Sequence, residues 1–173
     1  TVPFNPISII CLSPGAAEVI YALGESDRII AVTDDCDMPP ALLEKESIGK
    51  SSRNADLERI IELNPDLVIA KTGGLFPEED EQKLTDYGIP VLRYRLVHIN
   101  ALIPMIEDLG RILGEEEDAR DMANDISGYY DSVLDRTGTM PDEDRPSVYF
   151  MSMGPFDWTG NRDSTGHVRI AEA

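Results

Sequence analysis

Four short runs of apolar residues are spaced along the first part of the chain. They occupy residues 7–12, 29–32, 67–70 and 91–97. A continuous apolar run bounded by turn residues is typical of a strand covered on both faces, because a half-exposed strand would alternate between apolar and polar positions. The pattern therefore predicts four strands. Residues 7–12 and 67–70 are expected to be buried, whereas Arg93 and Arg95 interrupt the apolar residues of 91–97.

The stretch before the third run has the periodicity of an amphipathic helix. Leu57, Ile60 and Ile61 have the i, i+3 and i+4 spacing that forms one apolar stripe. Asn54 or Asp56 can cap this helix, because a short polar side chain accepts a hydrogen bond from a free N–H of the first turn. An Asn-Pro pair ends it, since the residue before proline is disfavoured in a helix.

Similar signals mark the other helices between the strands. Predicted starts and the glycines that follow the helices are Ser13-Pro14 with Gly24, Pro77 with Gly88, and Ile99 with Gly114. Serine is the expected cap of the first of them, with proline at its first position. The alternation of strand and helix predicts an α/β fold, a Rossmann-like lobe with a central parallel sheet and helices on both faces.

A longer and more acidic helix is predicted over residues 115–136. Its apolar face consists of Ala119, Met122, Ala123, Ile126, Tyr130 and Val133. A turn rich in Gly, Pro and Asp follows at residues 137–146, and a further strand is predicted at residues 147–151. The order of elements thus changes after the first lobe.

The net charge of the chain argues against some classes of binding partner. Acidic residues number 33 and basic residues 15, for a net charge of -18. Nucleic acid and anionic membrane surfaces repel such a chain, which argues against both. A solvated acidic surface explains the charge, with attraction to a cationic partner as the alternative. Cys11 and Cys36 have neither zinc-site nor disulfide-framework spacing, although a bridge between them stays open.

Motifs for catalysis or nucleotide binding are missing from the sequence. His98 and His167 lie far apart, and no H-E-x-x-H, C-x-x-C, G-x-S-x-G, Walker A or G-x-G-x-x-G pattern occurs. We therefore expect neither enzyme activity nor a cofactor. We assign no metal ligand, although Asp34, Asp35 and Asp37 leave a metal site open, because carboxylates in a loop also serve as turn and cap residues. The alternative is a flavodoxin-like signalling or catalytic domain that uses Asp34, Asp35 and Lys71.

Three stretches, in order, carry a resemblance to a known family. Residues 54–74 read N-A-D-L-E-R-I-I-E-L-N-P-D-L-V-I-A-K-T-G-G, residues 7–24 read I-S-I-I-C-L-S-P-G-A-A-E-V-I-Y-A-L-G, and residues 31–40 read A-V-T-D-D-C-D-M-P-P. They resemble the N-L-E-x-I-x-x-L-x-P-D-L-V-I segment, the first strand with its Ser-Pro turn and helix, and the D-Y-P-P loop of BtuF-like, or class III, periplasmic binding proteins. These are the substrate-binding proteins of iron-siderophore, haem and vitamin B12 ABC importers.

The resemblance implies a division of the chain and a function. Residues 1–114 would form the N-terminal lobe, residues 115–137 a helix that links two lobes, and residues 138–173 the beginning of a truncated C-terminal lobe. The protein would work outside the cell, periplasmic or anchored to the outer face of the membrane. It would capture an iron chelate, haem or corrinoid and deliver it to an ABC permease dimer.

Ligand contacts are expected in the loops that follow the strands, because open α/β sheets bind ligands at that edge. The candidates are Ser13, Asp35, Ser51, Lys71 and Arg95. In the resembled family, members that bind B12 have aromatic residues at the positions that match Asp35, Ser51 and Lys71. Their absence here disfavours cobalamin, and Lys71 with Arg95 suits a carboxylate or another anion instead. Ordinary solvated loop residues are the alternative.

Two further candidates depend on the resemblance. Glu58 matches a family glutamate that pairs with arginines of the permease, and charge pairs of this kind fix the docking register. Trp158 follows the strand that would open the second lobe and is expected to stack on a flat ligand. The alternatives are an exposed helical carboxylate for Glu58 and packing within its own lobe for Trp158.

Overall fold

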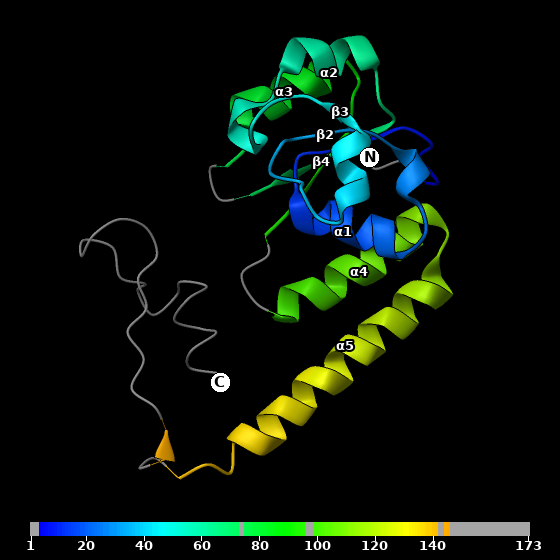
Figure 1. The fold of residues 1–173 in the computed structure, drawn as a ribbon. Coiled ribbons are helices and arrows are strands. Elements are labelled where there is room, and N and C mark those ends of the chain that lie inside the picture. Colours follow the sequence, from blue (N-terminus) through cyan, green and yellow to red (C-terminus); the bar gives the residue numbers. More distant parts are fainter. Residues whose placement is uncertain (1–3, 73–74, 96–98, 142–143, 146–173) are drawn as a thin grey trace, which may run out of the picture.

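The computed structural model describes residues 4–72, 75–95, 99–141 and 144–145. Five parallel strands form one sheet at its centre (Figure 1). They are β1 (Ile9–Cys11), β2 (Ile29–Val32), β3 (Glu46–Ser47), β4 (Leu67–Lys71) and β5 (Val91–Tyr94), in the order β3-β2-β1-β4-β5. Four of them confirm predicted strands. Strand β2 has the predicted bounds, β1 and β5 are shorter than predicted, and β4 is one residue longer. The fifth, β3, was not predicted, because its two residues are exposed and have no apolar signal.

Helices cover both faces of this sheet, as predicted (Figure 1). They are α1 (Pro14–Ala22), α2 (Leu57–Leu63), α3 (Glu78–Asp86), α4 (Ile99–Leu113) and α5 (Glu116–Thr137), with short 3-10 turns η1 (Ser26–Arg28), η2 (Pro40–Glu44) and η3 (Ser52–Asn54). Helices α2 and α3 lie on one face, and α1 and α4 lie on the other, with α5 running along α4. The α/β fold is therefore confirmed.

The strands explain why both faces are covered. In β1, Ile9 and Cys11 belong to the apolar cluster under α1 and α4, whereas Ile10 belongs to the cluster under α2 and α3. In β4, Leu67 and Ile69 belong to the cluster under α1 and α4, whereas Val68 and Ala70 belong to the cluster under α2 and α3. Strands β1 and β4 therefore bury successive side chains on opposite faces, as a continuous apolar run requires.

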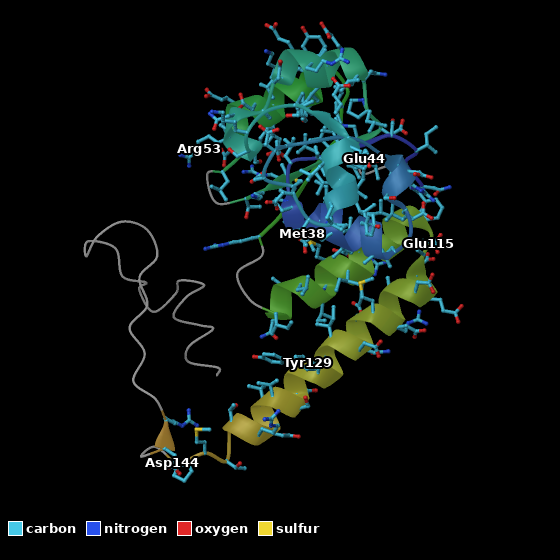
Figure 2. All side chains as sticks on the ribbon, viewed as in Figure 1. Met38, Glu44, Arg53, Glu115, Tyr129 and Asp144 are labelled. Atoms are coloured by element: carbon cyan, nitrogen blue, oxygen red, sulfur yellow. The ribbon has the colours of Figure 1, made fainter. Side chains whose placement is uncertain are left out.

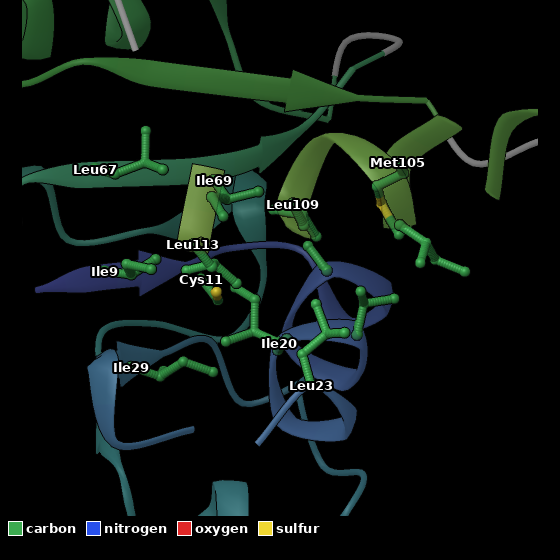
Figure 3. Close-up of a cluster of buried hydrophobic side chains, with 14 of the residues drawn as sticks. Ile9, Cys11, Ile20, Leu23, Ile29, Leu67, Ile69, Met105, Leu109 and Leu113 are labelled. Carbon is green, nitrogen blue, oxygen red and sulfur yellow. The ribbon is translucent and has the colours of Figure 1, made fainter. Parts of the chain in front are cut away.

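The larger cluster joins the sheet to α1 and α4. Figure 3 shows Ile9 and Ile69 of the strands facing Ile20 of α1 and Leu109 of α4. Cys11 is a fully buried member of this cluster and packs as a small core residue.

The start of α2 follows the sequence prediction, and the start of α1 departs from it. Asp56 caps α2 by accepting the N–H of Arg59 at 3.0 Å, and Asn64 ends the helix in the left-handed conformation. Ser13 occupies the cap position of α1 with Pro14 after it, but its side chain makes no capping hydrogen bond. The predicted serine cap is thus correct in position and wrong in the bond.

Helix α5 runs back along α4 and extends past the first turn of α4 (Figure 1). Ala119 and Ala123 are buried against the lobe, and Met122 and Ile126 pack partly against it. Within the described ranges, none of the helices is both long enough and apolar enough to cross a membrane. The strand predicted at residues 147–151 lies outside the described residues.

Candidate functional site

The carboxyl ends of the parallel strands meet along one edge of the sheet, and the loops that leave them carry the predicted ligand residues. Ser13 follows β1, Asp35 follows β2, Ser51 follows β3, Lys71 ends β4 and Arg95 follows β5. Because β1 is the middle strand, the loops after β2 and β4 flank the loop after β1. We call these loops the carboxyl edge.

An ion pair joins the two flanking loops. The Lys71 ammonium donates to Asp35 Oδ2 at 2.7 Å. Thr33 Oγ1 donates to Asp35 Oδ1 at 2.6 Å, so each carboxylate oxygen has a donor. The side chains of Lys71 and Asp35 are 29% and 32% exposed, which leaves the pair within reach of solvent. Two residues predicted as separate ligand contacts are therefore partners of each other.

Ser13 lies at the carboxyl edge but is nearly covered. The residue is only 2% exposed, although it begins α1 directly after β1. A ligand could reach Ser13 only through the neighbouring loops.

Ser51 lies in a tightly built loop. Gly49 and Ala55 form an isolated antiparallel bridge that closes it, and the carbonyl of Gly49 accepts the N–H of Asp34 at 2.8 Å. Inside the loop, Ser51 Oγ donates to Asn54 Oδ1 at 3.3 Å. This backbone closure fixes the position of Ser51 relative to the loop after β2.

Sequence reasoning missed Thr33 and the burial of Cys36. Cys36 is 1% exposed, and its Sγ lies 3.6 Å from Thr33 Oγ1 and 3.7 Å from the carbonyl oxygen of Cys11. Both thiols are free, so the bridge left open by the sequence is not formed in the structure. Burial raises the pKa of Cys11 and of Cys36, which keeps both thiols protonated. The position of Thr33 directly after an apolar run is the signal that could have identified it.

At the end of β5, two neighbouring residues have different surroundings. Tyr94 packs against the cluster under α4, and burial, with a smaller contribution from Asp108, raises its pKa. Arg95 is exposed. Arg95 is therefore the residue of this pair that a ligand at the carboxyl edge can meet. Trp158, His98 and His167 lie outside the described residues.

The aspartates after β2 do not converge on one point. Asp34 accepts a hydrogen bond from Ser47 Oγ in β3, whereas Asp35 pairs with Lys71. In the part of the chain that the structure describes, no three His, Cys, Asp or Glu side chains are grouped so that they could hold a metal ion.

Glu58 lies in the first turn of α2 and is exposed. The neighbouring Arg59 is bound to other carboxylates, with Nε 2.6 Å from Glu46 Oε1 and Nη1 3.0 Å from Glu62 Oε2. The hydrogen bond from this guanidinium lowers the pKa of Glu46. Among the described residues Glu58 has no ion-pair partner, so its carboxylate is available to another molecule.

Comparison with known proteins identifies the family of this chain. The model of the periplasmic binding protein family matches residues 9–166, which is most of the chain. The chain belongs to the periplasmic binding protein family. The resemblance carried by the three sequence stretches is therefore confirmed.

Relatives in this family include transport proteins of known and unknown ligand. The uncharacterized ABC transporter substrate-binding lipoprotein YvrC of Bacillus subtilis is 28% identical over 95% of this chain and 52% of its own length. A vitamin B12-binding protein of Vibrio cholerae is 32% identical over 72% of this chain and 44% of its own length. The chain spans about half the length of the curated relatives it matches.

Solved structures of periplasmic binding proteins share the fold. The periplasmic vitamin B12-binding protein BtuF of Vibrio cholerae has a TM-score of 0.71 at 28% identity, covering 79% of this chain and 53% of that one. The molybdate-binding protein MolA of Haemophilus influenzae has a TM-score of 0.73 and covers 84% of this chain and 52% of its own, but at 16% identity it supports the fold alone.

These comparisons favour a binding protein over the signalling alternative. The matched relatives are substrate-binding proteins rather than receivers or enzymes. The pairing of Asp35 with Lys71 does not support a signalling domain either. A phospho-acceptor receiver domain has a pair of acidic residues after its first strand, whereas Ser13 lies in the loop after β1. The family name and the lipoprotein relative also indicate a location outside the cytoplasm.

Proposed function

We propose that the chain is the ligand-capturing part of a substrate-binding protein that delivers an iron chelate, haem or corrinoid to an ABC importer. The observation that carries this proposal is the match of the lobe to the vitamin B12-binding protein of Vibrio cholerae, together with a carboxyl edge of polar loop residues. The protein binds and releases its ligand without chemical change, and it works outside the cell.

The proposal includes a two-lobed protein. Residues 1–114 form the first lobe, α5 links it to a second lobe, and residues 138–173 begin that second lobe. The length of α5, 22 residues, supports this division, because the helix extends past the first turn of α4 (Figure 1). The apolar residues Tyr130, Val133 and Leu134 in the second half of α5 are half-buried. A continuous helix between the lobes permits little hinge motion, so the ligand is held between two nearly fixed surfaces.

The carboxyl edge favours a polar chelate over a corrin ring. A flat macrocycle is best covered by aromatic side chains. Asp35, Ser51 and Lys71 are charged or polar, and the first and last of them bind each other. Arg95 adds an exposed guanidinium, which can bind a carboxylate with two parallel hydrogen bonds.

A titration of the full-length protein tests capture. Fluorescence of Trp158 would be followed while cobalamin, cobinamide, haem and several ferric siderophores are added. We expect saturable quenching by a ferric siderophore at or below about micromolar concentration. Saturation by cobalamin instead would overturn the preference for a polar chelate, and the absence of any response would argue against the importer function.

Docking on the permease is proposed to use Glu58. Its exposed carboxylate in the first turn of α2, without an ion-pair partner in the described ranges, supports contact with a cationic partner. Glu58→Arg should lower ligand uptake by the reconstituted importer about tenfold or more, because a pair becomes a like-charge repulsion. The dissociation constant of the ligand should not change.

A matched control separates docking from general charge. Glu117 is also exposed in the first turn of a helix, α5. Glu117→Arg makes the same change in net charge and should leave uptake within about twofold of the parent protein, since long-range surface charge is screened by salt. Equal losses in the two variants would contradict a specific role for Glu58.

A further inference from the structure

The carboxyl edge is richer in positive charge than the rest of the chain. The chain carries a net charge of -18. The loops after β2, β3, β4 and β5, with the last residue of β4, have equal numbers of basic and acidic residues: Lys45, Lys50, Arg53, Lys71 and Arg95 against Asp34, Asp35, Asp37, Glu44 and Asp56. Figure 2 shows Arg53 at the margin of the lobe, on the opposite side from Glu115 at the start of α5. An anion that approaches this acidic protein is therefore repelled less at this edge than over the rest of the chain.

Arginines elsewhere in the lobe are bound to carboxylates. The pairs are Arg28 with Glu25, Arg59 with Glu46 and Glu62, Arg93 with Glu81, and Arg111 with Asp108. None of these pairs includes a residue of the loops that follow β1 and β2. The pair of Lys71 with Asp35 differs, because it lies at the edge where a ligand is expected.

Asp35 binds Lys71 in the way that a ligand carboxylate would. Its Oδ2 lies 2.7 Å from the ammonium, and its Oδ1 accepts the hydroxyl hydrogen of Thr33. A carboxylate or phosphate of a ligand presents the same acceptor oxygens to these donors. An ammonium has three N–H donors, so a second anion could also contact Lys71, but the charge of Asp35 would repel it at that distance.

We propose that Asp35 is an internal stand-in for a ligand oxyanion, and that an anionic chelate exchanges with it on Lys71. This inference rests on the proposed capture of a small ligand at the carboxyl edge. Partial exposure of both side chains makes the pair weak enough to exchange, since solvent-screened pairs contribute little. An anion must therefore bind Lys71 more strongly than Asp35 does in order to replace it. Simple inorganic anions do not bind strongly enough.

The test compares an anionic and a cationic ferric chelate on the full-length protein. Ferric citrate and ferrioxamine B would be titrated into the parent protein and into Asp35→Asn, Lys71→Met and the double variant. Asp35→Asn should bind ferric citrate about tenfold more tightly, and Lys71→Met about tenfold more weakly. The double variant should lose the tenfold gain of Asp35→Asn, because without the ammonium the anion has no donor to take over from Asp35.

Asp37→Asn is the control for general charge. Asp37 is exposed in the same loop, so its removal changes net charge equally. It should alter ferric citrate affinity by less than about threefold, and ferrioxamine B should not gain affinity in Asp35→Asn. Equal effects of Asp35→Asn and Asp37→Asn, or a gain that persists in the double variant, would overturn the stand-in role.

A second measurement separates this inference from the proposed function. Free citrate would be titrated while the amide resonances of Lys71 and Thr72 are followed by NMR. Saturable shifts in Asp35→Asn that vanish in the double variant would support the exchange, even if no chelate in the panel binds. The lack of chelate binding would then count against the importer function and not against the exchange. Absence of such shifts in Asp35→Asn overturns the inference whatever the chelates do.

Discussion

An aspartate links separate segments at each end of the strands, Asp66 at the amino ends and Asp35 at the carboxyl ends, and the two aspartates bond to different kinds of group. At the amino edge, Asp66 Oδ2 accepts the backbone N–H of Ile7 at 2.9 Å and of Ser8 at 3.0 Å. Ser8 Oγ in turn accepts the N–H of Asp66 at 3.0 Å. At the carboxyl edge, Asp35 bonds only to the side chains of Lys71 and Thr33 among the described residues.

This difference indicates that the hydrogen bonds of Asp66, rather than the ion pair of Asp35, stabilise the fold. Backbone donors are held by the strands they precede, so Asp66 binds them without ordering a long side chain. These bonds, led by that from Ile7, lower the pKa of Asp66, which means that the folded state favours its charged form. Lys71 must instead be ordered to meet Asp35, and solvent screens the pair. The amino edge is therefore the structural tie, and the carboxyl edge the exchangeable one.

The largest effect is expected where the carboxyl edge also depends on backbone. Gly49 has φ of +129°, and a Cβ there would lie 2.2 Å from the carbonyl oxygen of Asn54. Gly49→Ala should lower the free energy of unfolding by about 3 kcal/mol, because strain and a backbone clash add. Urea denaturation would measure the loss.

Gly88 provides the matched control for Gly49. Its φ is +81°, but a Cβ there would meet nothing within 4 Å. Gly88→Ala should therefore cost about 1 kcal/mol, from backbone strain alone. Equal losses for the two glycines would mean that the bridge between Gly49 and Ala55 does not constrain this loop.

The sequence predicts the strands and helices better than it predicts the side-chain contacts between loops. Apolar runs such as residues 67–70 identify the strands because burial on both faces requires them, and Asp56 is recognisable as a cap from local spacing alone. The pairing of Asp35 with Lys71 is different. It joins residues 36 positions apart and exists because β2 and β4 flank β1, an order that periodicity does not contain.

Burial in loops was equally hidden from the sequence. Cys36 and Ser52 lie in polar stretches without a regular pattern, yet they are 1% and 2% exposed. Their burial follows from how the loops after β2 and β3 fold back onto the sheet. The candidate ligand residues were thus predicted by position, and their mutual contacts required the structure.

A smaller effect is expected at the amino edge. Asp66→Asn keeps the size of the side chain but removes its charge, so we expect a loss of about 1 kcal/mol near neutral pH, moderated by solvent exposure. The folded-state pKa is lowered, so this contribution is present above the unfolded pKa of about 4 and is lost as pH falls through the folded pKa. Unfolding free energies of parent and variant should converge in that acidic window.

Asp27→Asn is the control for Asp66. Asp27 is exposed in η1, and its substitution changes net charge by the same amount. It should leave the free energy of unfolding within about 0.5 kcal/mol of the parent protein at every pH. A pH-independent difference between Asp66→Asn and the parent protein would show that the charge of Asp66 is not what the backbone amides stabilise.

The smallest change is expected for the ion pair at the carboxyl edge. Asp35→Asn should alter the free energy of unfolding by no more than about 0.5 kcal/mol, because a partly exposed pair contributes little and the amide oxygen can still accept from Thr33. Urea denaturation without ligand would measure it beside Asp66→Asn. A loss as large as that of Asp66→Asn would show that the pair stabilises the fold. Displacement of Asp35 by a ligand would then destabilise the protein, which would contradict the difference between the two edges.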